Sequence, residues 1–65
     1  MLKEFQNKRF KTRYSVYAVL YDDELKQFCV GEWSPSCKSY IRISNYYRNP
    51  VPVENIIKKM VSRYE

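Results

Sequence analysis

The stretch RYSVYAVLY at residues 13–21 decides the fold of this chain. β-Branched and aromatic residues fill it with a period of two, and this pattern is typical of a β-strand. One face of the strand carries the even-numbered residues Tyr14, Val16, Ala18 and Leu20. The other face carries the odd-numbered residues Tyr17, Val19 and Tyr21. The stretch therefore predicts a β-strand.

A second strand follows directly along the chain. The acidic residues 22–24, Asp-Asp-Glu, end the first strand because aspartate favours turns. The next stretch, QFCVGEW at residues 27–33, again alternates between two faces. Its Gly31 is the single glycine of the chain, and in a strand it indicates a bulge or a close packing contact. Together the two stretches predict a β-hairpin.

The C-terminal segment predicts an amphipathic helix. Apolar residues recur there at the spacing of one helical face, at Val53, Ile56, Ile57, Met60, Val61 and Tyr64. Pro52 suits a first helical turn, and Glu54 suits the positive end of the helix dipole. The opposite face carries Lys58, Lys59 and Arg63. We expect the apolar stripe to pack across the sheet.

The stretch SPSCKSYIRISNYYRN at residues 34–49 allows two interpretations. Ser34-Pro35 is a good helix start, so residues 35–47 could be helical. Against this, Tyr40, Ile41 and Ile43 are strong strand formers. We favour a third strand, because a lone hairpin offers a helix little sheet to cover. The predicted fold is therefore α+β, a small three-stranded antiparallel sheet (the hairpin plus a third strand) packed by one C-terminal helix.

The N-terminal stretch MLKEFQNKRFKT has no regular pattern. Isolated apolar residues stand among charges, so we expect residues 1–12 to form one or two helical turns or a flexible basic arm. The proline-containing joint at residues 49–52 is too short to separate domains. We therefore treat residues 1–65 as a single domain.

The chain has a net charge of +5, and this charge is uneven. Residues 1–14 carry +4, residues 15–33 carry −3, residues 34–52 carry +3 and residues 53–65 carry +1. A basic balance suits a polyanionic partner such as nucleic acid, because Lys and Arg release the counterions condensed on phosphates. It equally serves the solubility of a small protein.

Several functions and locations are disfavoured by composition. No apolar run approaches the ~18 residues of a membrane span, and no export signal follows Met1, so we expect a cytoplasmic protein without membrane contact. Cys29 and Cys37 should then be reduced. The chain has no histidine, which removes the commonest general base and zinc ligand, and two cysteines are too few for a structural zinc site. We predict neither an enzyme nor a metal or small-molecule cofactor.

Basic residues interleaved with aromatic ones are the remaining functional signal. Single-stranded nucleic acid is held by such surfaces, with bases stacked on rings and phosphates contacted by cations. We predict a non-enzymatic nucleic-acid-binding domain with a basic and tyrosine-rich surface. Its candidate residues are Lys8, Arg9, Lys11, Arg13, Lys38, Arg42, Tyr46, Tyr47 and Arg48.

A protein partner is the alternative. Enrichment in tyrosine and arginine equally describes a protein-binding surface. The chain would then be a small inhibitor or adaptor that binds a larger nucleic-acid-processing protein. Its oligomeric state, including a homodimer, is left open by the sequence.

Overall fold

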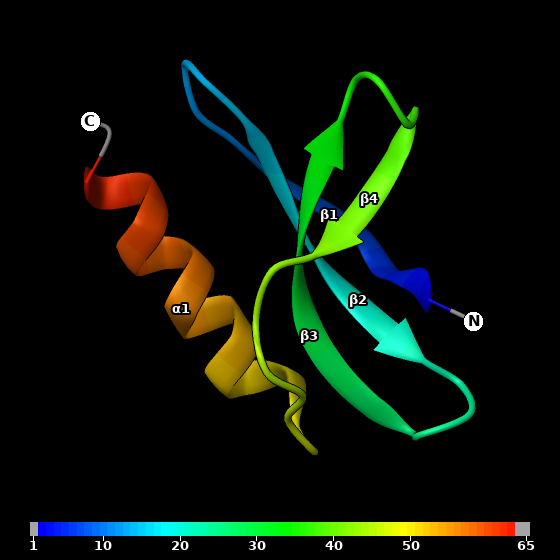
Figure 1. Ribbon diagram of the computed structural model, residues 1–65. Helices are drawn as coiled ribbons and strands as arrows, with labels where there is room; N and C mark the ends of the chain where they lie inside the picture. The colour runs from blue at the N-terminus through cyan, green and yellow to red at the C-terminus, as the bar shows by residue number, and fades with distance from the viewer. Residues whose placement is uncertain (1, 64–65) are drawn as a thin grey trace.

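A computed structural model describes residues 2–63, except for the side chain of Asn7. Within this range the chain forms an antiparallel sheet of four strands in the order β1-β2-β3-β4, and one helix lies against it (Figure 1). The strands are β1 (Leu2–Lys11), β2 (Val16–Asp22), β3 (Gln27–Ser34) and β4 (Ser39–Arg42), and the helix is α1 (Pro50–Arg63). The predicted α+β class is confirmed.

The uncertain stretch at residues 34–49 contains the predicted third strand, which is β4. Its four residues pair antiparallel with the end of β3, from Gly31↔Arg42 to Ser34↔Ser39. The chain then stays beside β3 as far as an isolated bridge between Tyr47 and Phe28. The helical alternative for residues 35–47 is therefore wrong. Strand-forming side chains and the free edge of β3 together outweigh the helix-start signal.

The three-stranded sheet is corrected to four strands by the N-terminal segment. Residues 2–11, which we expected to be helical turns or an arm, form β1 and pair with β2. Phe5 and Phe10, which looked isolated in the sequence, pack against the core beneath α1. Pairing also satisfies the backbone groups along the edge of β2.

A wide bulge interrupts β1. Glu4 pairs with Leu20 and Arg9 with Ala18, so the four residues between Glu4 and Arg9 lie opposite the single residue Val19. Gln6, within this bulge, adopts a left-handed backbone conformation with φ of 61°. Because Leu20 and Ala18 are two apart on one strand, Glu4 and Arg9 emerge next to each other on the same face of the sheet.

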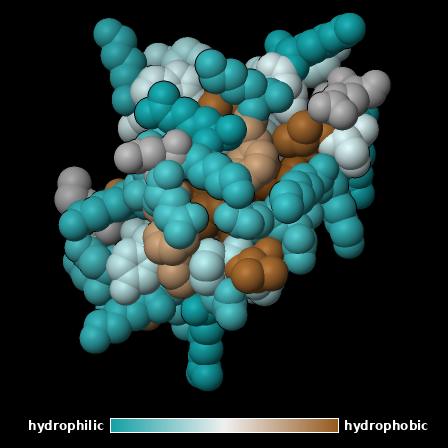
Figure 2. Space-filling view, turned by 180° about the vertical axis from the view of Figure 1, so that it is seen from behind, coloured by the Kyte–Doolittle hydropathy of each residue, from teal (hydrophilic) through white to brown (hydrophobic). Residues whose placement is uncertain are grey.

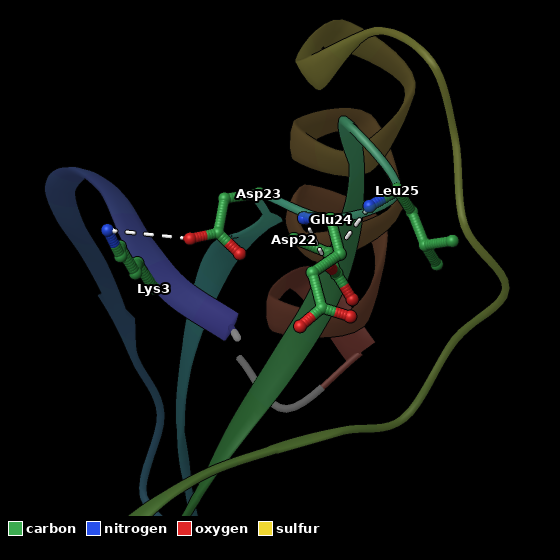
Figure 3. A network of polar contacts seen from close by, with 5 residues as sticks. All are labelled: Lys3, Asp22, Asp23, Glu24 and Leu25. Carbon is green, nitrogen blue, oxygen red and sulfur yellow. Dashed lines mark hydrogen bonds and ion pairs between the residues drawn. The ribbon is translucent and has the colours of Figure 1, made fainter.

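The turn between β2 and β3 is held by its first residue. Asp22 Oδ1 accepts hydrogen bonds from the backbone N–H groups of Glu24 and Leu25, at 2.9 and 3.2 Å (Figure 3). These bonds, that of Leu25 first, lower the pKa of the Asp22 carboxyl. In the same view Lys3 of β1 forms an ion pair with Asp23 at 3.6 Å. The turn thus ties β1 to the hairpin.

The other two turns use a first residue in the same way. Thr12 Oγ1 accepts from the N–H of Ser15 at 3.0 Å, and Ser34 Oγ accepts from the N–H of Cys37 at 3.3 Å. The turn after β3 ends on Lys38 with φ of 52°, just as the turn after β2 ends on Lys26 with φ of 56°. Short side-chain acceptors at these positions favour turns over continued strands.

Helix α1 covers the face of the sheet that carries the odd-numbered residues of β2. The helix begins at Pro50, and Asn49 Oδ1 caps it by accepting from the N–H of Val51 at 3.1 Å. We expected Glu54 to lie in the first turn, near the positive end of the helix dipole. It lies beyond the first turn instead, because the helix begins earlier than expected. The buried core under the helix consists of Tyr17, Val19, Val30, Val53 and Ile57. The predicted stripe is confirmed from Val53 to Val61, and Tyr64 lies outside the described residues.

Other properties bear on the functional expectations. Cys29 is buried and Cys37 exposed, and both are free thiols. Burial raises the pKa of the Cys29 thiol, which makes it a packing residue rather than a nucleophile. No helix within residues 2–63 is long and apolar enough to cross a membrane. The same range contains no cluster of three carboxylate or cysteine side chains that could hold a metal ion.

Candidate nucleic-acid interface

The face of the sheet turned away from α1, which we call the open face, carries the even-numbered residues of β2. Ala18 and Leu20 of this face are buried although α1 lies on the other side of the sheet. Leu20 lines a hollow together with longer side chains of the neighbouring strands. Seen from behind, the molecule shows apolar residues in an interrupted band framed by polar and charged ones (Figure 2). A surface of this kind combines flat apolar contact with charge at its borders.

Two aromatic rings are the central feature of the open face. Trp33 of β3 pairs across strands with Tyr40 of β4, and their rings meet edge to face with centroids 5.2 Å apart. Trp33 remains 39% exposed. The two rings line a hollow of 190 Å³ together with Val16 and the cationic residues Arg9 and Lys11. A ring beside two cations is the arrangement that holds a base and its flanking phosphates.

A second hollow extends this site toward the turn between β1 and β2. It has a volume of 220 Å³ and shares Val16 and Trp33 with the first hollow. Arg13 and Tyr14 line it from the turn, and Pro35 lines it from the start of the next turn. Within residues 2–63 no carboxylate lies in ion-pair distance of Lys11 or Arg13. Both cations are therefore available to an anionic ligand.

Arg9 differs from Lys11 because it is engaged by a carboxylate. Its Nε donates to Glu4 Oε1 at 3.2 Å and its Nη2 donates to Glu4 Oε2 at 3.5 Å. The hydrogen bond with Glu4 raises the pKa of the Arg9 guanidinium, so this side chain is a permanent cation. Burial raises the pKa of Tyr40, and repulsion from the Glu4 carboxylate raises it further. Tyr40 therefore keeps its hydroxyl proton at neutral pH.

Arg42 and Tyr46 continue the cationic and aromatic pattern beyond Tyr40. The guanidinium of Arg42 lies over the Tyr46 ring, 4.8 Å from its centroid, and donates to the carbonyl of Ser44 at 2.6 Å. The Tyr46 hydroxyl donates to Asp22 Oδ2 at 3.4 Å. Desolvation raises the pKa of Tyr46, and the charge of Asp22 adds to this shift. Arg42 follows Tyr40 by two residues and so projects from the same face.

The remaining predicted residues lie elsewhere. Lys8 projects toward the helix side, where it forms an ion pair with Glu54 at 3.8 Å and lies near the Phe10 ring. Tyr47 packs against the core under α1 and is not a free ring. Lys38 and Arg48 are exposed in the turn after β3 and in the loop before α1. From the predicted set, the structure brings Arg9 and Lys11 together at one hollow and places Arg13 at the adjoining one. It pairs Arg42 with Tyr46 further along the same face.

Trp33 and Tyr40 were not among the predicted site residues. A signal for Trp33 was present in the sequence, because period-two spacing puts it on the same face as Cys29 and Gly31. Its proximity to Tyr40 depends on the turn at residues 35–38, which sets the register of β3 against β4. The sequence allowed both a helix and a strand at Tyr40, so it did not determine this pairing.

The open face offers guanidinium and ammonium donors, a phenol hydroxyl and flat rings. Comparison with protein-family models, with curated proteins and with solved structures gave no match.

Proposed function

We propose that this protein is a non-enzymatic domain that binds single-stranded nucleic acid on its open face. A base stacks on Trp33 and Tyr40, and the flanking phosphates contact Lys11 and Arg9 on one side and Arg42 on the other. We place this domain in the cytoplasm, which suits two free thiols.

The observation that carries this proposal is the half-exposed Trp33, which lies beside Tyr40 and lines hollows that also contain Lys11 and Arg13, two cations with no ion-pair partner within residues 2–63. Lys58, Lys59 and Arg63 on α1 also form a cationic surface. No aromatic ring is described on that helix within residues 50–63, so the helix offers charge without a stacking platform. Stacking on an aromatic side chain is worth ~1 to 3 kcal/mol per base, which favours the open face over the helix.

Trp33 allows a direct test because it is the single tryptophan of the chain. Titration with an oligothymidylate of about 12 nucleotides, a length within the usual range for such domains, should quench its fluorescence. Trp33→Ala should weaken binding of a labelled oligonucleotide roughly 5- to 150-fold, the equivalent of ~1 to 3 kcal/mol. Fluorescence anisotropy measures this loss.

Two results would contradict the proposal. The first is no binding of DNA or RNA at low salt, where electrostatic binding is strongest. The second is binding that leaves Trp33 fluorescence and the affinity of Trp33→Ala unchanged. Thermal unfolding of Trp33→Ala serves as the control, because the variant must remain folded for the comparison to hold.

The protein-binding alternative has its own supporting observation. Ile41 and Ile43 are 50% and 44% exposed at the edge strand β4 and just beyond it. An exposed strand edge with apolar side chains is a surface to which a partner can add a strand. Two results together would favour the inhibitor or adaptor function. The protein would retain a protein partner after nuclease treatment, and it would show no affinity for oligonucleotides.

A further inference from the structure

Among residues 2–63, the Glu4–Arg9 pair is the one place on the open face where an anion already contacts a cation of the proposed site. The two residues are five apart in β1 and would lie well over 10 Å apart on a regular strand. The bulge brings them together, since it places both opposite β2 residues that are only two apart. Both carboxylate oxygens then meet two nitrogens of one guanidinium.

This geometry is the one that a phosphate adopts on arginine. A planar guanidinium binds carboxylate and phosphate through the same pair of parallel N–H donors. A hollow of 260 Å³ lies over Glu4 and Arg9 and is also lined by Trp33 and Tyr40. An anion on Arg9 would therefore lie beside the two rings on which a base stacks.

We propose that Glu4 occupies, in the free protein, the position of a phosphate on Arg9, and that a phosphodiester of the bound strand displaces it. This inference rests on the proposed function, because it names the phosphate subsite of the open face. Arg9 supplies the two donors of the subsite, and Tyr40 supplies a hydroxyl donor beside it. Glu4 is an internal competitor that sets the affinity of the site.

The competition has a cost that can be measured. Binding must break the Glu4–Arg9 pair and leave the Glu4 carboxylate beside an incoming phosphate of like charge. The Glu4 side chain is only 19% exposed, so solvent screens this repulsion incompletely. Removing the charge of Glu4 should therefore strengthen binding.

The test is Glu4→Gln, with the affinity for oligothymidylate measured by anisotropy over a range of salt concentrations. We expect the affinity to rise roughly three- to tenfold, from an ion pair that no longer competes and a repulsion that is relieved. In the parent, the Glu4 carboxylate that is freed on binding takes up a cation from solution, and this offsets the counterion that the phosphate releases. Glu4→Gln has no such carboxylate, so the slope of log affinity against log salt should steepen by up to about one unit.

Glu54→Gln is the matched control, because Glu54 of α1 pairs with a cation of β1 on the helix side of the sheet. Glu54 forms an ion pair with the β1 residue Lys8 at 3.8 Å, and its side chain is 23% exposed. The two variants remove the same charge and each release one cation of β1. The control separates the local competition from the general gain that any lost negative charge produces. We expect Glu54→Gln to change the affinity much less.

A double-variant cycle tests whether the effect passes through Arg9. In an Arg9→Gln background, Glu4→Gln should give little or none of its gain, because the two residues act on each other. Thermal unfolding of each variant shows whether the domain remains folded. If Glu4 is a competitor, Glu4→Gln should raise the affinity even when the variant is slightly less stable than the parent.

The outcomes are distinguishable. Equal gains in Glu4→Gln and Glu54→Gln, a gain that persists without Arg9, or a loss of affinity in Glu4→Gln would overturn the competition while leaving the proposed function in place. A loss of affinity would show that Glu4 positions Arg9 for its ligand. If neither the parent nor any variant binds at low salt, the proposed function fails and the inference fails with it.

Discussion

At Gly31 a missing side chain makes room for a neighbouring one. A Cβ added at this position would lie 2.5 Å from Cδ1 and 2.6 Å from Cγ of Leu20, closer than carbon atoms approach without displacement. Gly31 does not have a positive φ, so the backbone conformation does not require glycine. Of the two meanings that the sequence suggested for Gly31, the structure shows the close packing contact. Leu20 is 2% exposed and has little room to move.

Gly31→Ala should therefore destabilise the protein by about 1 to 3 kcal/mol, the usual cost of overpacking a well-packed site. In a domain of this size each kcal/mol lowers the melting temperature by roughly 4 to 8 °C. The cost should shrink in a Leu20→Ala background, where the space is free. Chemical denaturation of the two single variants and the double variant measures this coupling. An equal cost in both backgrounds would rule out the steric explanation.

At the scale of the element, α1 joins the fold through one face. Val53 and Ile57 are fully buried, while Ile56, Met60 and Val61 are packed at the border of the core. The other face carries Lys58 and Lys59, which are exposed. A helix of 14 residues is marginal by itself in water, so its stability comes from this packing.

Ile57→Ala should cost about 2 to 5 kcal/mol in unfolding free energy, because it leaves a cavity between the helix and the sheet. This is a large part of the ~5 to 15 kcal/mol that a small domain has. Lys58→Ala, one residue further along on the exposed face, should melt close to the parent. If Ile57→Ala instead melts like the parent but no longer binds its ligand, the stripe is an interface and not a core.

At the scale of the whole molecule, two groups of positive charges lie on surfaces of different character. Arg9, Lys11 and Arg42 stand on the open face beside aromatic rings. Lys58, Lys59 and Arg63 stand on α1, on the other layer of the fold. Net charge attracts nucleic acid to both surfaces, whereas stacking holds it on one.

Two double variants with the same change in charge distinguish the surfaces. Lys11→Gln with Arg42→Gln removes two proposed phosphate contacts of the open face that have no carboxylate partner within residues 2–63. This double variant should reduce the slope of log affinity against log salt by about 1.4, at ~0.7 per contact with a single strand. Lys58→Gln with Lys59→Gln should leave this slope nearly unchanged. A larger effect of the helix variant would move the binding surface to α1.

Local patterns of the sequence determined three of the elements, because alternation and helical spacing depend on residues close together in the chain. Residues 13–21 and 27–33 predicted β2 and β3, and the stripe from Val53 predicted α1. The interleaved cations and aromatics indicated binding, and five of the residues they singled out meet on or beside the open face.

Contacts between distant segments decided the rest. The period of β1 is broken by its bulge, so no local pattern could show that it is a strand or that Glu4 reaches Arg9. The register of β3 against β4 brought Trp33 to Tyr40. Because α1 covers one face of the sheet, Tyr47 packs against the core under the helix, whereas Tyr46 contacts Arg42. These outcomes depend on strand pairing and on burial against partners far along the chain, which a local pattern does not encode.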